Sequence, residues 1–592
     1  MRYPGHILIV MMLGALLVVG CKGNADKESS TSTQKSPAAK PTNEGNAGVG
    51  RGGNGAVAGT GRGGNGVKSD DKMAVEMEEA DDEAPPAEPA MVKREMAKKD
   101  AKPGAKSKRP MRVTGKGGRV APSKPKPKPV SPPPPAPEPD PVANSEDYKD
   151  YGINKFIDPN KDKLSTFSVD VDTGAYTIAR RKLKANQLPP ARAVRVEEFV
   201  NFFKYDYPQP DGEIPFAVAF EAAPSPLTKD TVMLRVGVQG RRVSDADRKP
   251  AHLVFLIDTS GSMSSPDKIG LAKQSMHMLV NQLKEGDTVG ICTYAGSVTE
   301  VIQPTSMDKR AAIHEAIEQI MAGGSTAMAD GLETAYKMAY KTLKPGHINR
   351  ILVLSDGDAN VGQDSHEGIL KRIGHYTLEG VTLSTIGLGM GNYKDTMMEQ
   401  LANKGNGNYY YIDSFKEARR IFTEQLGGTL QVIAKDVKIQ VEFDPAVVKS
   451  YRLIGYENRD IADKDFRNDA VDAGEIGAGH QVTALYELKL NKSFDGTPTI
   501  VRIRHKAPQG AKATETEYRL GKQHFVKDYS EASRSFRLAV AVGAFAEKMR
   551  QSPYATNWAW EKVHQLAKDA ANTSGDEQEL LALMGQAQKL SK

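Results

Sequence analysis

Short apolar runs and amphipathic helical stretches alternate along the chain between residues 251 and 427. Leu253–Ile257 is a continuous apolar run, which is typical of a strand buried on both faces of a parallel sheet. From Lys268 to Leu283 the apolar residues recur at helical spacing instead. The alternation continues with strands expected at 288–294, 351–354, 381–388 and 408–412, and helices at 309–320, 330–341, 366–376, 396–402 and 416–426. This order predicts an α/β fold with a doubly wound, mostly parallel sheet.

Strand patterns also flank this α/β unit on both sides. Before it we expect helices at 175–184 and 194–204 and strands at 215–221 and 231–238; after it we expect strands at 437–443, 482–490, 499–505 and 517–520. The strict alternation of Val437–Phe443 predicts a strand with one solvated face. We therefore expect the α/β unit to be inserted in, or docked on, a small β-sheet that draws strands from each flank. Apolar residues at helical spacing near the C-terminus predict a final helical segment.

The N-terminal quarter of the chain has a different pattern. Ile7–Val19 is an apolar run too short to cross a bilayer but typical of an export signal. The Gly-, Lys- and Pro-rich residues that follow cannot bury enough apolar surface to form a core, which predicts a disordered tether. The sequence thus divides into a signal peptide (1–20), a tether (21–145), an N-terminal flank (146–250), the α/β domain (251–427) and a C-terminal β-rich and helical region (428–592).

Charge and cysteine content narrow the possible functions. The 80 basic and 74 acidic residues leave a net charge of +6, which is too mixed to indicate nucleic-acid binding. Within the tether, residues 93–128 hold 14 Lys or Arg against Glu95 and Asp100. This block either contacts anionic lipid or cell-wall polymers or is a solvated spacer, and the absence of interleaved aromatic residues favours the spacer. The two cysteines, Cys21 and Cys292, exclude a disulfide scaffold.

Cys21 lies at the end of the export signal. The sequence Leu17-Val-Val-Gly-Cys21 resembles the lipoprotein box of bacterial lipoproteins. The resemblance implies cleavage before Cys21, acylation of its sulfur and a stable anchor in a membrane of the bacterial cell envelope. Lys22 follows where an aspartate would indicate retention at the inner membrane in some bacteria, so the outer membrane is favoured.

Three groups of polar residues are expected at the edge where ligands of doubly wound sheets bind. They are Asp258, Ser260 and Ser262 after the first strand, Thr326 after Gly323-Gly-Ser, and Asp356 after the strand 351–354. Two carboxylates and three hydroxyls, without His or Cys, suit a small, hard divalent cation with octahedral geometry. We expect Mg²⁺, with Mn²⁺ or Ca²⁺ as alternatives.

This set of residues resembles the metal-ion-dependent adhesion site of von Willebrand factor type A (VWA) domains. Asp258-x-Ser260-x-Ser262 matches its first element, Thr326 the second and Asp356 the third. In that family the two serines bind the metal directly, the threonine binds directly or through water, and the carboxylates act largely through bound waters. An open coordination position accepts an acidic side chain of a protein partner. The resemblance implies a VWA lipoprotein that binds a protein and is not an enzyme. In addition, the stretches 165–207, 451–459 and 472–480 resemble the regions that flank the VWA domain in a family of bacterial lipoproteins.

Two further motifs leave alternatives open. Asp172-Thr-Gly-Ala resembles the start of an aspartic-protease motif, but that chemistry needs a second copy, which the sequence lacks. We interpret 168–174 as a strand and turn before the helix 175–184, with Asp172 or Thr173 as its N-cap. Asp472, Glu475 and His480 form either a site or a Gly-rich turn. Two alternative functions stay open. One is a cell-envelope hydrolase that uses Asp172 or the cation, and the other is a metal-independent spacer between membrane and cell wall.

Overall fold

The computed structural model describes residues 146–592, except 325–327, 492–497 and most of 358–379. The expected signal peptide and tether, with Cys21, lie outside the described residues. Thr326 and most of the helix expected at 366–376 lie outside them too. Over the part of the chain that is described, no helix has the length and apolar character needed to span a bilayer.

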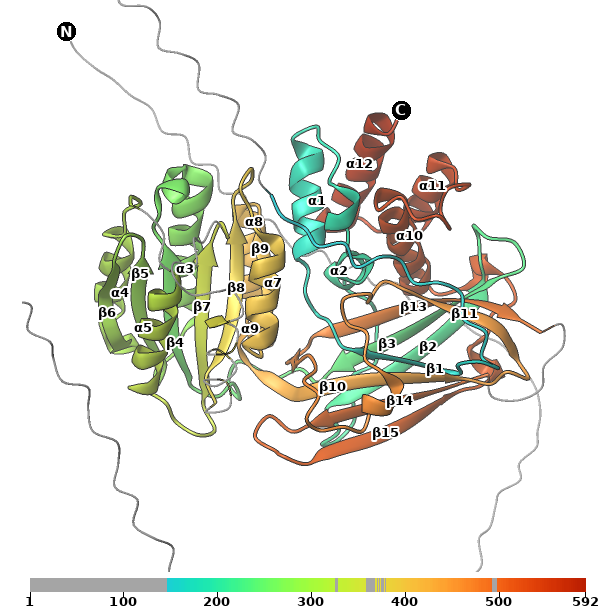
Figure 1. Cartoon of the computed structure of the whole chain (residues 1–592), viewed down its shortest axis with the longest axis horizontal. Helices are drawn as coiled ribbons and strands as arrows, with labels where there is room; N and C mark the ends of the chain where they lie inside the picture. The colour runs from blue at the N-terminus through green and yellow to red at the C-terminus, as the bar shows by residue number, and fades with distance from the viewer. Residues whose placement is uncertain are drawn as a thin grey trace, which may run out of the picture. The chain divides into compact units, whose positions relative to one another are not determined.

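The α/β unit is built on a six-stranded sheet with the order β6-β5-β4-β7-β8-β9 (Figure 1). The strands are β4 (Ala251–Asp258), β5 (Thr288–Tyr294), β6 (Val298–Ser306), β7 (Ile348–Ser355), β8 (Thr382–Leu388) and β9 (Tyr409–Ile412). All neighbouring pairs are parallel except β5 and β6. The predicted doubly wound, mostly parallel sheet is therefore confirmed. The antiparallel edge strand β6 was not predicted, because its side chains are mostly half-exposed and it lacks an apolar run.

Helices cover both faces of this sheet. They are α3 (Leu271–Gln282), α4 (Arg310–Glu318), α5 (Met328–Tyr340), α7 (Asp395–Lys404), α8 (Phe415–Arg419) and α9 (Leu426–Leu430). Successive residues of a strand point to opposite faces. Phe255 accordingly packs in a core with Met276 of α3, whereas Leu256 packs in the opposite core with Leu332 of α5. Burial on both faces explains why β4 is apolar without alternation.

Strands from the two flanks form two antiparallel sheets. One has the order β1 (Leu164–Ser168), β10 (Val432–Phe443), β14 (Thr499–Lys506) and β15 (Ala513–Leu520), with β12 (Ile476–Gly477) beside β10; the other has the order β11 (Val448–Ile454), β13 (Gln481–Leu490), β3 (Val232–Gly240) and β2 (Phe216–Pro224). Side chains from both sheets, such as Ile439 and Val236, share one core. Both flanks contribute, as expected, but to a sandwich of two sheets instead of one small sheet.

The solvated face predicted for Val437–Phe443 is wrong. Lys438 and Gln440 are buried. The Lys438 ammonium donates to the carbonyl oxygens of Asp465 and Asn468, and the Gln440 amide donates to Thr166 Oγ1. The polar side chains on this face thus contact protein groups, which the alternating pattern does not reveal.

A layer of helices covers the outer face of the sheet that contains β13 (Figure 1). It consists of α1 (Gly174–Lys184), α2 (Val196–Phe202), α10 (Arg534–Met549), α11 (Trp560–Ala570) and α12 (Gly575–Leu590). Phe199 of α2 and Phe545 of α10 belong to its core. Helix α1 also packs against β9, the edge strand of the α/β unit, where Ile178 joins Tyr409 and Tyr411 in a small core. The N-terminal flank therefore covers an edge of the α/β sheet.

Candidate metal-binding site

The carboxyl ends of β4 and β7 lie side by side and bring two of the predicted site residues together. These strands pair in parallel, with Ile257 opposite Leu354, so Asp258 and Asp356 extend from the same edge of the sheet. Both aspartates are fully buried. Asp258 Oδ2 accepts a hydrogen bond from Ser355 Oγ at 2.9 Å, and Oδ1 accepts one from the Ser260 backbone N–H at 2.8 Å. The first carboxylate of the predicted site is thus held in one orientation.

The two predicted serine ligands lie next to each other in the loop after β4. Ser260 Oγ is 2.9 Å from Ser262 Oγ. Two neighbouring ligands of an octahedral Mg²⁺, each at 2.0–2.1 Å from the ion, are separated by about 2.9 Å. Ser260 is buried and Ser262 is partly exposed. The spacing of the hydroxyl oxygens therefore fits the expected cation.

The loop that precedes Thr326 is bonded to the loop after β4. The Gly261 N–H donates to the Gly324 carbonyl at 3.0 Å, and the Gly323 N–H donates to the Thr259 carbonyl at 2.7 Å. Gly324 has a φ of +107°, which favours glycine at this close contact. Thr326 itself is outside the described residues, so its role as a ligand stays a prediction.

Buried charge gives the site its electrostatic character. Burial and the neighbouring Asp356 raise the pKa of Asp258, against the hydrogen bonds from Ser260 and Ser355. Lys268 lies in the turn Pro266–Gly270 before α3, and its ammonium is 2.9 Å from Asp356 Oδ2. Nothing in the sequence placed Lys268 at the site, since it was expected only as the first residue of a helix.

In the described part of the chain, no three His, Cys, Asp or Glu side chains form a metal-binding group. A cation at the edge of the sheet would therefore have to use hydroxyl ligands as well. Ser260 and Ser262 provide such ligands, and together with Asp258 and Asp356 they form an all-oxygen set, which selects hard cations over zinc.

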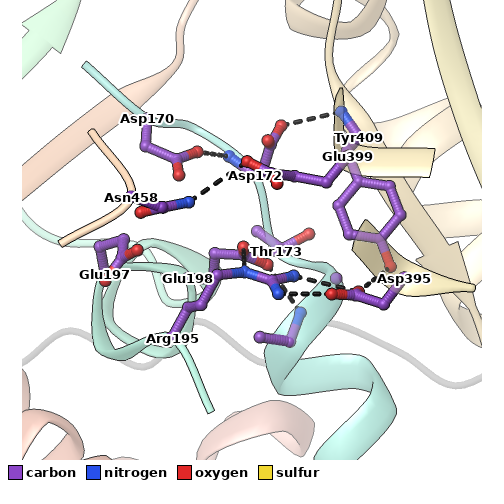
Figure 2. Close-up of polar contacts among 12 residues, drawn as sticks. Asp170, Asp172, Thr173, Arg195, Glu197, Glu198, Asp395, Glu399, Tyr409 and Asn458 are labelled. Atoms are coloured by element: carbon purple, nitrogen blue, oxygen red, sulfur yellow. Dashed lines mark hydrogen bonds and ion pairs between the residues drawn. The ribbon is translucent and has the colours of Figure 1, made fainter. Parts of the chain in front are cut away.

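A second polar cluster lies where the α/β unit meets the flanks (Figure 2). Its buried carboxylates surround the guanidinium groups of Arg195 and Arg459. The carboxylates paired with these two groups are those of Asp170, Asp172, Glu198, Asp395 and Glu399, and buried Glu197 lies next to Glu198. Burial raises the pKa of Glu197 to about 8, with Glu457 as the next cause, and burial raises that of Glu198 to about 7 against the effect of Arg195.

Asp172, the residue that resembled a protease aspartate, belongs to this cluster. Its Oδ1 accepts the Tyr409 backbone N–H at 2.8 Å (Figure 2). Its Oδ2 is 3.0 Å from Arg459 Nη2. Gly174 packs so closely on the Tyr409 ring that a Cβ at this position would overlap it. Asp172 and Gly174 thus join the N-terminal flank to strand β9, and these contacts account for the motif structurally.

Thr173, one of the two predicted residues, is the N-cap of helix α1, but its side chain makes no capping hydrogen bond. Neither Asp172 nor Thr173 accepts a hydrogen bond from the first turn of the helix. The Ala175 N–H donates instead to Glu198 Oε2, from helix α2, at 2.7 Å. The expected strand at 168–174 is also displaced, because β1 ends at Ser168 and the following residues turn into the cluster.

Asp472, Glu475 and His480 lie in the connection between β11 and β13. His480 is buried, and its Nδ1 accepts the Gly477 N–H at 3.2 Å. Burial, followed by nearby Lys204, lowers the pKa of His480 to about 3. Burial raises the pKa of Glu475. The Gly477–His480 hydrogen bond is typical of a turn, which favours the Gly-rich turn over a site formed by these three residues.

The sheet order and the matching family model define a protein with a VWA domain. The model of the von Willebrand factor type A domain matches residues 252–424. A model described as von Willebrand factor matches residues 142–235, and that of the C-terminal region of the uncharacterized protein YfbK matches 428–497 and 497–590. VWA domains generally mediate protein–protein interactions and are typically adhesion modules rather than enzymes.

The chain belongs to the YfbK family. It is 39% identical over 449 residues to the uncharacterized protein YfbK of Escherichia coli (strain K12), and the alignment covers 72% of this chain and 77% of that protein. It is also 25% identical over 283 residues to an uncharacterized protein of Synechocystis, covering 46% of this chain and 66% of the relative. Among solved structures, a von Willebrand factor type A protein from Catenulispora acidiphila is similar, with a TM-score of 0.41, 16% identity, and coverage of 64% of this chain and 91% of the other.

Proposed function

We propose that this chain is a lipoprotein of the bacterial cell envelope whose VWA domain binds a protein partner through a divalent cation. Acyl chains on Cys21 would anchor it, with the outer membrane favoured. The cation would be Mg²⁺, with Mn²⁺ or Ca²⁺ as alternatives, and the partner would offer an acidic side chain. The protein would act in adhesion or assembly and not as an enzyme.

The observation that supports the proposal is the 2.9 Å spacing of Ser260 Oγ and Ser262 Oγ beside two buried aspartates. The serines would bind the ion directly, while Asp258 and Asp356 would act through water, with Thr326 as the further expected ligand. The ion would supply a positive charge that attracts a carboxylate of the partner. Ser262 is partly exposed, so the serine side of the site is open to solvent.

Affinity capture from envelope extracts tests the proposal. The full chain is used as bait with Mg²⁺ or with a chelator, and bound proteins are identified by mass spectrometry. We expect Ser260→Ala to lose the Mg²⁺-dependent partners at an unchanged thermal unfolding temperature. Ser264→Ala is the matched control, because Ser264 lies in the same loop but outside the predicted ligand set, its side chain is exposed and its Oγ donates to the Gly261 carbonyl. A partner set that is the same with chelator, or with Ser260→Ala, contradicts the proposal.

Membrane anchoring is tested separately by fractionation. We expect Cys21→Ser to move the protein from the membrane pellet to the soluble fraction, because the acylated cysteine would be lost. A variant that stays in the pellet after a high-salt wash contradicts the lipid anchor, and release by salt alone indicates that the basic block binds the membrane.

A further inference from the structure

Lys268 places a fixed positive charge at the edge of the sheet where the candidate metal ligands lie. Its ammonium is 2.9 Å from Asp356 Oδ2 and 3.0 Å from Asn392 Oδ1. The Asn392 amide also donates to Asp356 Oδ2, at 3.2 Å. Lys268 is 8% exposed, so this charge is largely removed from solvent. The ammonium is therefore part of the structure of the site and not a mobile surface group.

The surrounding backbone is shaped to hold this side chain. Lys268 lies in a π-helical turn, Pro266–Gly270, and such turns are frequent at functional sites. Its aliphatic stem crosses Gly389, directly after β8, where a Cβ would overlap the stem. Gly389 has a φ of +77°, which glycine adopts without strain. Two separate loops thus leave room for one lysine to reach Asp356.

The ammonium compensates buried negative charge. Asp258 and Asp356 are both fully buried and extend from the ends of two neighbouring parallel strands, in which Ile257 lies opposite Leu354. A buried carboxylate needs a cation or hydrogen-bond donors nearby. Lys268 provides both to Asp356. Any divalent cation that uses Asp356, directly or through water, has to replace the ammonium or bind despite its charge.

We infer that Lys268 is a built-in competitor of the metal ion. In the free protein its ammonium neutralises Asp356, which weakens metal binding, and the ammonium leaves Asp356 when the ion binds. The site is then filled at a higher concentration of divalent cation than it would be without Lys268, and partner binding depends on that concentration. This inference rests on the proposed metal-dependent function and adds a means of regulating it.

Metal titration of the full chain in detergent tests the inference. Free Mn²⁺ is measured by electron paramagnetic resonance, and binding at this site is defined as the part that Ser260→Ala removes. We expect Lys268→Met to bind Mn²⁺ at least tenfold more tightly than the wild type. Lys268→Gln keeps a hydrogen-bond donor for Asp356 and is used if the methionine variant does not fold. It should also bind Mn²⁺ more tightly than the wild type. Lys273→Met is the control, because Lys273 lies on α3 and pairs with Glu318 instead.

A second measurement uses the wild-type chain. A lysine released from Asp356 becomes accessible to an amine-acetylating reagent, so we expect Mn²⁺ to increase the acetylation of Lys268 several-fold, as measured by peptide mass spectrometry. Two results would overturn the inference and leave the metal site in place. One is Mn²⁺ binding by both Lys268 variants that is equal to or weaker than that of the wild type, and the other is unchanged acetylation of Lys268 at saturating Mn²⁺. The absence of Ser260-dependent Mn²⁺ binding in the wild type and in both variants overturns the metal site, and the inference with it.

Discussion

Removal of the Arg459 side chain should weaken the junction between the VWA domain and its flanks. Its guanidinium is 2.9 Å from Asp170, 3.0 Å from Asp172 and 3.1 Å from Glu399 of α7. All four side chains are buried. Arg459→Met keeps much of the volume but leaves these carboxylates without their shared cation. Removing one partner of a buried ion pair costs about 3–5 kcal/mol.

Protonation limits this cost and gives it a characteristic pH dependence. In the folded variant, one of these carboxylates would take up a proton. Its pKa in the unfolded chain is near 4, so this protonation costs about 4 kcal/mol at pH 7, and each lower pH unit reduces the cost by about 1.4 kcal/mol. We therefore expect Arg459→Met to lose about 4 kcal/mol at pH 7 and only about 1–2 kcal/mol at pH 5. For roughly 440 folded residues, the loss at pH 7 lowers the unfolding temperature by about 4 °C if they unfold as one unit.

Chemical denaturation at both pH values measures this effect. Arg467→Met is the control, because Arg467 is exposed and pairs with half-buried Glu515, so a loss below about 0.5 kcal/mol is expected. A loss below 1 kcal/mol for Arg459→Met at pH 7, or an equal loss at pH 7 and pH 5, would refute the assignment of Arg459 as the shared cation.

Two further substitutions test the packing and a buried histidine. Gly174→Ala should destabilise the fold by about 1–3 kcal/mol in denaturant titrations, because the added Cβ would overlap the Tyr409 ring. The control is Gly585→Ala, in an open part of α12, which should be neutral or stabilising. The pKa of His480 is about 3 in the folded protein and about 6.5 in the unfolded chain. The stability that the neutral histidine provides is therefore present above pH 6.5 and is lost as the pH falls toward 3. The difference in unfolding free energy between wild type and His480→Gln should therefore shrink by about 2 kcal/mol from pH 7 to pH 5, and a constant difference would contradict the buried neutral histidine.

The VWA fold was predictable because its strands are buried on both faces. A run such as Leu253–Ile257 needs no partner information to be identified as a central strand, and the polar residues that follow it mark the ligand-binding edge. Edge strands gave weaker patterns. β6 is half-exposed, and β1 ends before the Asp170–Gly174 segment that appeared extended. Their positions are fixed by neighbouring strands far away in sequence, which a local pattern does not contain.

The candidate site was predictable only in part, for a similar reason. Asp258, Ser260 and Ser262 are adjacent in sequence, so their spacing alone indicates a shared site. Lys268 reaches Asp356 over 88 positions, and Glu198 rather than a neighbouring residue accepts the Ala175 N–H in the first turn of α1. Contacts of this kind depend on the tertiary fold. The same limit explains why Asp172 resembled a catalytic residue although it pairs with Arg459 and the backbone of Tyr409.

The N-terminal flank meets the VWA domain beside the candidate metal site. The Asp147 N–H donates to the Tyr393 carbonyl at 3.0 Å, and Glu146 accepts the Gly391 N–H at 3.0 Å while it pairs with Lys182 of α1. These contacts flank Asn392, which bonds both Lys268 and Asp356. Arg181 of α1 pairs with Asp267, next to Lys268. Glu146 and Asp147 of the N-terminal flank thus contact the same loop whose Asn392 bonds Lys268, so this flank helps to hold the candidate site in place.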